Sequence, residues 1–313
     1  MKYIEHVNAL IRKNIADVDN LVCFGQNISA GSCISGMTKG LKVKPGSMVI
    51  NTQNSENSLV GIGFGLMLSG VNAIFFMKQL DFLILGIDHI VNTYNIVRQE
   101  NPKASFTIVA VVVDSGYEGP QSAFNSFADI CSIARVPGYT VTNKADAEEI
   151  LSSKLVAPGF RIIGISQRLF KTELIELEKS YSNPNSEIFQ YMYGKDATIA
   201  CFNMSLPYGL ELQKKLAENN IHASLFSVNA MTPIDWHKLL DDAKATKNLV
   251  ILDDSKSANK SCHMLMADAY RTCRLENCIL VERELSPKWF RPTSDAFEIS
   301  YEKIIAQLSQ KHH

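Results

Sequence analysis

Short apolar runs alternate with segments of helical periodicity along the whole chain. Runs that are apolar on both faces are typical of parallel strands covered by helices on each side of a sheet. The alternation therefore predicts open α/β sheets. We expect buried strands at residues 21–25, 106–114, 160–166, 197–202, 223–228, 248–254 and 277–282. We expect helices at residues 3–15, 56–70, 79–99, 207–220, 233–245, 256–273 and 298–309.

A polar stretch between residues 167 and 195 interrupts this pattern and contains the turn signal Asn-Pro-Asn-Ser at 183–186. With 313 residues, the chain is long enough for two domains with separate cores. We therefore expect a first domain over residues 1–185 and a second over residues 186–313.

Composition excludes several classes of partner. The 31 basic and 32 acidic residues give a net charge of −1, and no basic cluster stands out, so nucleic acid is not an expected partner. The apolar runs are too short or too interrupted to span a bilayer, and the first residues lack an apolar signal core. We expect no membrane contact and a cytoplasmic location.

The seven cysteines form no CxxC pair or zinc spacing, so we expect reduced thiols and no metal site.

The segment 51–70, NTQNSENSLVGIGFGLMLSG, places one acid, Glu56, at the start of an apolar helix. An acid in the first turn of a helix is usually a partner of the helix dipole. Its glycines do not form a dinucleotide loop, because leucines stand where GxGxxG needs its third glycine. Closely spaced glycines instead favour the close approach of another backbone, within the domain or across a subunit interface.

Six stretches together resemble the beta subunits of thiamine-diphosphate-dependent 2-oxoacid dehydrogenases and the matching half of transketolases. In the first half they are LVCFGQNISAGSCISGMTKGL (21–41), the segment 51–70, LDFLILGIDHIVNTYN (80–95) and GPQSAFNSFADICSIARVPGYTVTNKADAEEIL (119–151). In the second half they are GKDATIACFN (194–203) and VNAMTPIDWHKLL (228–240). The resemblance covers nearly the whole chain. It implies a pyrimidine-binding α/β domain followed by a transketolase C-terminal-like domain.

The resemblance gives Glu56 a role. The matching glutamate contacts N1′ of the cofactor's aminopyrimidine ring and favours its imino tautomer. The exocyclic nitrogen then takes the proton from thiazolium C2, and the ylide attacks a 2-oxo group. The family's aromatic positions around the pyrimidine fall on Phe76, Gln79 and Phe82, although both phenylalanines could equally fill the core.

The chain departs from the family at three places. Gln26 replaces an acidic residue. Gln121 and Ser122, which we expect to face substrate, stand where the family carries a nearby histidine. The stretch SKSANKSCHM (255–264) replaces a glycine-rich segment, which argues against docking to a larger acyltransferase core.

The chain contains no GDG motif, which in this family helps to bind magnesium and the cofactor's diphosphate. The resemblance therefore implies an alpha-type partner that supplies that half of the site in an α₂β₂ assembly, with the helix 56–70 a candidate for close helix contact. The expected substrate is a 2-oxo acid or related ketose.

Two alternatives to this function stay open. One is a split transketolase-like ketol transferase, although the first domain is poor in the histidines and arginines that sugar phosphates favour. The other is a non-catalytic subunit, against which the presence of Glu56 argues.

Overall fold

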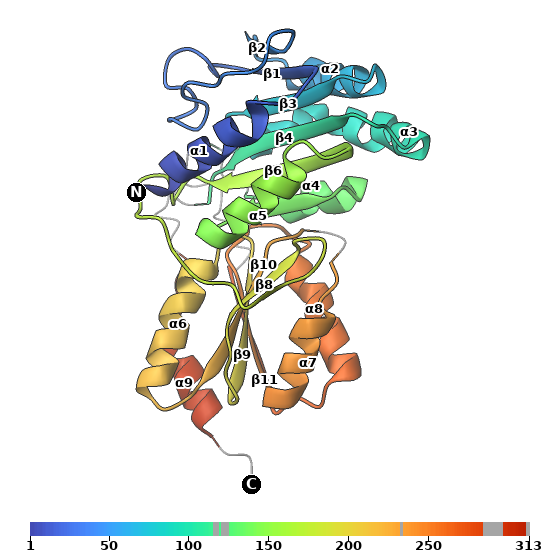
Figure 1. Cartoon of the computed structure of the whole chain (residues 1–313). Helices are drawn as coiled ribbons and strands as arrows, with labels where there is room; N and C mark the ends of the chain where they lie inside the picture. The colour runs from blue at the N-terminus through green and yellow to red at the C-terminus, as the bar shows by residue number, and fades with distance from the viewer. Residues whose placement is uncertain (115–118, 120–124, 232–233, 284–296, 311–313) are drawn as a thin grey trace.

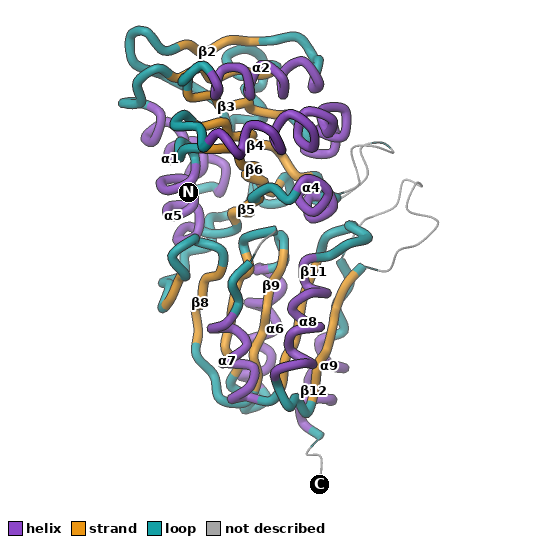
Figure 2. The backbone as a smooth tube through the Cα atoms, turned by 90° about the vertical axis from the view of Figure 1, so that its right-hand side faces the viewer, coloured by secondary structure: helices purple, strands orange, loops and turns teal. Residues whose placement is uncertain are grey.

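The computed structural model describes residues 1–114, 119, 125–231, 234–283 and 297–310. In this part of the chain two six-stranded sheets lie one beyond the other, each covered by helices on both faces (Figure 1; Figure 2). The expected open α/β architecture is confirmed. None of the described helices is long and apolar enough to cross a membrane.

The first sheet is entirely parallel, in the order β2-β1-β3-β4-β6-β5. Its strands are β1 (Leu21–Gly25), β2 (Met48–Asn51), β3 (Asn72–Met77), β4 (Ser105–Val112), β5 (Gly138–Val141) and β6 (Gly159–Ser166). One face is covered by α1 (Tyr3–Ile15) and α5 (Lys144–Lys154). The other face is covered by α2 (Glu56–Leu68), η1 (Leu80–Gly86), η2 (His89–Thr93), α3 (Tyr94–Val97), η3 (Arg98–Glu100) and α4 (Phe127–Ala134).

The second sheet has the order β12-β11-β9-β10-β8-β7 and is mixed, because β8 runs antiparallel to β10 and β7. Its strands are β7 (Tyr181–Ser182), β8 (Ile188–Met192), β9 (Ala197–Phe202), β10 (Ala223–Val228), β11 (Asn248–Asp253) and β12 (Asn277–Glu282). Its helices are α6 (Leu206–Glu218) and α9 (Tyr301–Ser309) on one face, and α7 (His237–Thr246) and α8 (Ser261–Thr272) on the other (Figure 1).

All seven expected strands are present to within one or two residues. The expected continuous helix at 79–99 is wrong: this segment forms 3₁₀, π, α and 3₁₀ turns in succession. Gly86 lies in the middle of it and permits a contact with Val60 that a regular side chain would block, since a Cβ there would lie 2.7 Å from Val60 Cγ2. The second sheet begins with β7, just before the expected domain boundary at residue 185. The division at that residue stays a proposal.

The carboxyl ends of strands from both sheets meet in a buried ionic cluster. The Arg168 guanidinium, after β6, lies 3.4 Å from an Asp114 carboxylate oxygen after β4 and 3.1 Å from an Asp254 carboxylate oxygen after β11. Both carboxylates are fully buried. Because buried charges are tolerated only when paired, this cluster fixes how the two sheets lie against each other.

A second polar contact between the domains is centred on Asp146 in α5. Its carboxylate accepts hydrogen bonds from Thr142 and Asn143 at distances from 2.6 to 3.2 Å, and from the Asn229 amide at 2.9 Å. Asn229 follows β10, and its amide also donates to the Thr140 carbonyl at 2.8 Å. Burial raises the pKa of Asp146 to about 6, although these hydrogen bonds oppose the shift.

This pKa predicts a dependence of stability on pH. Because folding raises the pKa of Asp146, the folded protein binds a proton that the unfolded chain releases, so the contribution is present at low pH and lost as pH rises through about 6. We expect the contribution of this residue to the free energy of unfolding to fall by about 1–3 kcal/mol as pH rises from about 4 to about 6. Urea titrations at a series of pH values should show that the free energy of unfolding of Asp146→Asn changes less with pH than that of the wild type. The exposed control Asp241→Asn should keep the wild-type profile, and an equally steep Asp146→Asn profile would contradict the assignment.

Candidate active site

A small hollow lies at the carboxyl edge of the first sheet, where parallel α/β sheets form their binding sites. Gln26 follows β1, Asn54 and Glu56 follow β2, and Lys78 follows β3. Although these residues are separated in the sequence, all four line the hollow, together with Leu59, Phe75, Phe76, Met77 and Phe82. One carboxylate therefore stands among aromatic and aliphatic side chains.

Glu56 owes its place to the way α2 begins. It is the first residue of the helix and is half-buried. The Leu59 amide donates to the Ser55 carbonyl at 2.8 Å, which closes the first turn. Gly86 lets η1 pack on this turn, because a Cβ there would lie 3.3 Å from the Glu56 carbonyl oxygen. The contact brings Phe82, in η1, to the same hollow as Glu56.

The expected pyrimidine-contacting positions differ in their surroundings. Phe76 lines the hollow but is fully buried, so its ring is part of the core. Phe82 lines the hollow and is half-buried, so part of its ring is open to a ligand. Gln79 is buried at the residue before η1, where its carbonyl accepts from the Phe82 amide at 3.3 Å, and it is not among the lining residues described. Gln121 and Ser122 lie outside the described residues.

Sequence reasoning missed Asn54, Lys78 and Met77 as lining residues. Each lies just beyond or at the end of a strand in the first sheet, so the only available signal was position relative to β2 and β3. Since neither of these strands was predicted, that signal could not be used.

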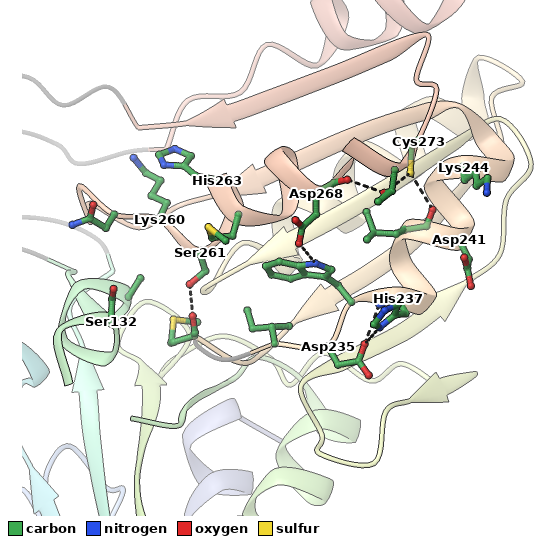
Figure 3. Close-up of a pocket in the computed structure, with 18 residues that line it drawn as sticks. Ser132, Asp235, His237, Asp241, Lys244, Lys260, Ser261, His263, Asp268 and Cys273 are labelled. Carbon is green, nitrogen blue, oxygen red and sulfur yellow. Dashed lines mark hydrogen bonds and ion pairs between the residues drawn. The ribbon is translucent and has the colours of Figure 1, made fainter. Parts of the chain in front are cut away.

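A larger cavity of about 880 Å³ lies between α4, α7 and α8 (Figure 3). Trp236 lines it, with its indole nitrogen donating to Asp268 at 3.0 Å. Ser132 of α4 borders it (Figure 3). The described linings of this cavity and of the Glu56 hollow share no residue. Size alone would favour the larger cavity, but its carboxylates lie among exposed or paired groups at the surface, so we place the candidate chemistry at Glu56.

The glycines of α2 separate into two kinds. A Cβ on Gly63 would lie 2.1 Å from the Phe106 ring, and one on Gly61 would lie 2.9 Å from the His89 ring. The absence of a side chain at these two glycines leaves room for the Phe106 and His89 rings of the same domain. Around Gly65, by contrast, a Cβ would meet no described atom within 4 Å. His89 bonds Thr93 through Nδ1 at 3.0 Å, which agrees with a structural role for this histidine.

The two kinds of glycine should respond differently to alanine. Gly63→Ala forces the buried Phe106 ring to move and should destabilise the chain by about 1–3 kcal/mol. Gly65→Ala fits into open space and should raise the stability of the isolated chain by up to about 1 kcal/mol through helix propensity. Chemical denaturation of the two variants measures both effects, and a loss of stability in Gly65→Ala would show that a neighbour fills that space.

No protein-family model matches the chain. The pyruvate dehydrogenase E1 component subunit beta of Dictyostelium discoideum is 25% identical over 259 residues, which cover 79% of this chain and 72% of that one. The 2-oxoisovalerate dehydrogenase subunit beta of Bacillus subtilis is 20% identical over 267 residues, 83% of this chain and 81% of that one. The chain is related to the beta subunits of 2-oxoacid dehydrogenases. The acetoin:2,6-dichlorophenolindophenol oxidoreductase subunit beta of Cupriavidus necator is 22% identical over 264 residues, 80% of this chain and 78% of that one.

Solved structures show the same fold as this chain. One described as "Split gene transketolase, inactive beta4 tetramer" superposes with a TM-score of 0.68 at 16% identity, covering 98% of this chain and 95% of that one. The transketolase of Campylobacter jejuni superposes with a TM-score of 0.64 at 11% identity and covers 97% of this chain but 44% of its own. The expected transketolase-like fold is thereby confirmed.

Proposed function

We propose that this chain is the beta-type subunit of a thiamine-diphosphate-dependent enzyme. The enzyme cleaves or decarboxylates a 2-oxo acid, or a ketose, and transfers the resulting acyl or aldehyde unit. The observation that carries the proposal is that Glu56, Phe76 and Phe82 line one hollow at the carboxyl edge of the first sheet. The names of the relatives favour a 2-oxo acid over a ketose as donor.

The residues of the hollow fit the cofactor's pyrimidine ring. Glu56 offers a carboxyl group beside the apolar Leu59 and the partly open ring of Phe82. The hollow itself measures about 10 Å³, room for about one water molecule, so it cannot enclose a ring. Glu56, Leu59 and Phe82 would hold the ring at the opening of the hollow, and cover from another chain would complete the site. An alpha-type partner that holds the diphosphate and magnesium would provide that cover.

When bound, thiamine diphosphate supplies the carbon nucleophile that attacks a 2-oxo group. Glu56 would hold a proton at a ring nitrogen of the pyrimidine through its carboxyl oxygen. Phe82 and Leu59 would exclude water from that contact, and the lower local dielectric strengthens the hydrogen bond. Gln26 and Lys78 place polar groups on the same lining.

Replacement of Glu56 by glutamine tests this role. Glu56→Gln keeps the shape of the side chain but cannot exchange a proton with the ring, so turnover should fall by about 10²- to 10⁴-fold. Steady-state kinetics on the complex with the partner chain measures the loss. Glu100→Gln, at an exposed position in η3, is the matched control and should keep wild-type turnover. If Glu56→Gln turned over at the control rate, the assignment of Glu56 would be wrong.

The surface for assembly is proposed from α2 and η1. Four apolar side chains stand exposed there and form what we call the α2–η1 surface: Ile62 (51%), Leu68 (53%), Ile84 (51%) and Leu85 (56%). Gly65, with open space around its Cα, would let a neighbouring backbone approach. Large exposed apolar patches mark subunit interfaces, and stable interfaces have apolar cores. We propose an α₂β₂ assembly that buries this surface.

A charge on the α2–η1 surface should prevent assembly without unfolding the chain. Ile62→Arg places an ion in an interface but leaves the core intact, because Ile62 is half exposed in the single chain. Analytical ultracentrifugation of the purified protein and of its complex should show smaller species. Met264→Arg, on exposed α8, is the control at similar exposure (57%). Wild-type assembly of Ile62→Arg would exclude this surface.

Capture of the chain from its own cells tests the proposal as a whole. We expect a stoichiometric partner and about one thiamine diphosphate per pair of chains, measured by mass spectrometry of the eluate. Turnover of pyruvate or branched 2-oxo acids would support the main proposal, and turnover of ketose phosphates alone would support a split transketolase. A complex that binds the cofactor but acts on neither donor class, or a chain that binds neither partner nor cofactor, would favour a non-catalytic subunit. The cytoplasmic location stays a prediction, since the Dictyostelium relative is named as mitochondrial.

A further inference from the structure

Asn125, two residues before α4, is bound to the second domain. It is fully buried, and its φ of 44° lies in the left-handed region that asparagine tolerates better than most residues. Its amide nitrogen donates to the Asp254 carbonyl at 3.2 Å, and its amide oxygen accepts from Asn203 at 3.3 Å. Its carbonyl accepts from the Lys256 amide at 3.2 Å. All these partners follow β9 or β11 of the second sheet.

Ser126, the next residue, is bound to the first domain. Its backbone amide and its hydroxyl donate to one carboxylate oxygen of Asp81, at 3.4 and 3.2 Å. Asp81 is buried in η1, directly before Phe82. Within the described residues the Ser126 hydroxyl makes no capping bond to α4. The hydrogen bond to Asp81 is therefore the contact that connects the Ser126 hydroxyl to the first domain.

The start of α4 is held to the second domain a second time. The Asp129 carboxylate accepts hydrogen bonds from the Ala258 amide at 3.1 Å and from the Asn259 amide and side chain at 3.0 and 3.1 Å. The loop between β11 and α8 therefore holds both the residue before Ser126 and the first turn of α4. This loop is the stretch in which the sequence departs from the family pattern.

We propose that Asn125 and Ser126 form a bridge through which the second domain positions η1, and with it the Phe82 wall of the Glu56 hollow. Both are positioning residues, because they act on the hollow through Asp81. Segments of 3₁₀-helix have poor hydrogen-bond geometry of their own, so η1 depends on contacts from its surroundings to stay in place. The effect on cofactor binding rests on the proposed function, whereas the bridge itself rests on the hydrogen bonds.

Three variants of the complex with its partner test the bridge. Asn125→Gly keeps the left-handed backbone but removes the amide contacts, and Ser126→Ala removes the hydroxyl contact. Asn220→Gly is the matched control, because Asn220 is also left-handed, with a φ of 60°, but is exposed after α6. Each bridge variant should raise the Kd for thiamine diphosphate by about three- to tenfold, as expected for a lost hydrogen bond, and the control should not.

The double variant distinguishes a bridge from two unrelated contacts. If the two residues act in series, Asn125→Gly combined with Ser126→Ala should weaken binding little more than the stronger single change. Multiplied effects would overturn the bridge. Variants that lower the melting temperature but leave the Kd unchanged would also overturn it, since they would show a purely structural role.

Hydrogen exchange gives a readout that does not need the cofactor. Amides of η1 should exchange faster in Asn125→Gly than in Asn220→Gly, because η1 loses its support from the second domain. If the wild-type complex failed to bind thiamine diphosphate, the proposed function would be wrong, and this comparison alone would decide the bridge. Equal exchange of η1 in the two variants would overturn it.

Discussion

The Arg168 guanidinium, shared between Asp114 and Asp254, is the interaction on which the arrangement of the molecule depends. Burial raises the pKa of Asp254 to about 6, and the positive charge of Arg168 opposes that shift. Removing Arg168 would leave two buried carboxylates without their guanidinium partner, which costs several kcal/mol by general experience. Because each carboxylate follows a strand of a different sheet, one pairing sets the carboxyl edges of both sheets against each other. The loops that leave those edges are thereby brought together at the start of α4.

The sequence predicts the architecture because the central strands are buried on both faces and therefore apolar throughout. It does not predict β2, β3, β5, β7 or β8, and β3 was missed although it is buried and apolar like the strands that were predicted. Three of the other strands have a physical reason. β2 is largely exposed, and β5 has only four residues. β8 alone reverses direction and lies in the polar stretch that suggested a domain boundary. The segment 79–99 has helical periodicity but not helical geometry, because its packing on α2 depends on a glycine that lets two backbones approach.

The candidate site is predictable only in part. Glu56 stands out because it is the one charged residue of a largely apolar helix, and the family resemblance gives that residue a role. Asn125 and Asp254 carry no such signal. They are 129 residues apart, and their contact joins a side-chain amide to a backbone carbonyl, which imposes no pattern on the sequence around it. Long-range polar contacts of this kind become visible only when the fold is known.

The character of α2 connects the chemistry of the site to assembly. A helix that is apolar on all sides is normally buried on all sides. In the single chain, Gly61 and Gly63 are explained by the His89 and Phe106 rings, but Gly65 and the exposed Ile62 have no described neighbour that requires them. The exposed side of α2 is therefore suited to contact with another chain. Since Glu56 is the first residue of this same helix, a chain that covers α2 would also lie near the Glu56 hollow. Assembly would then also bring a second chain to the candidate site.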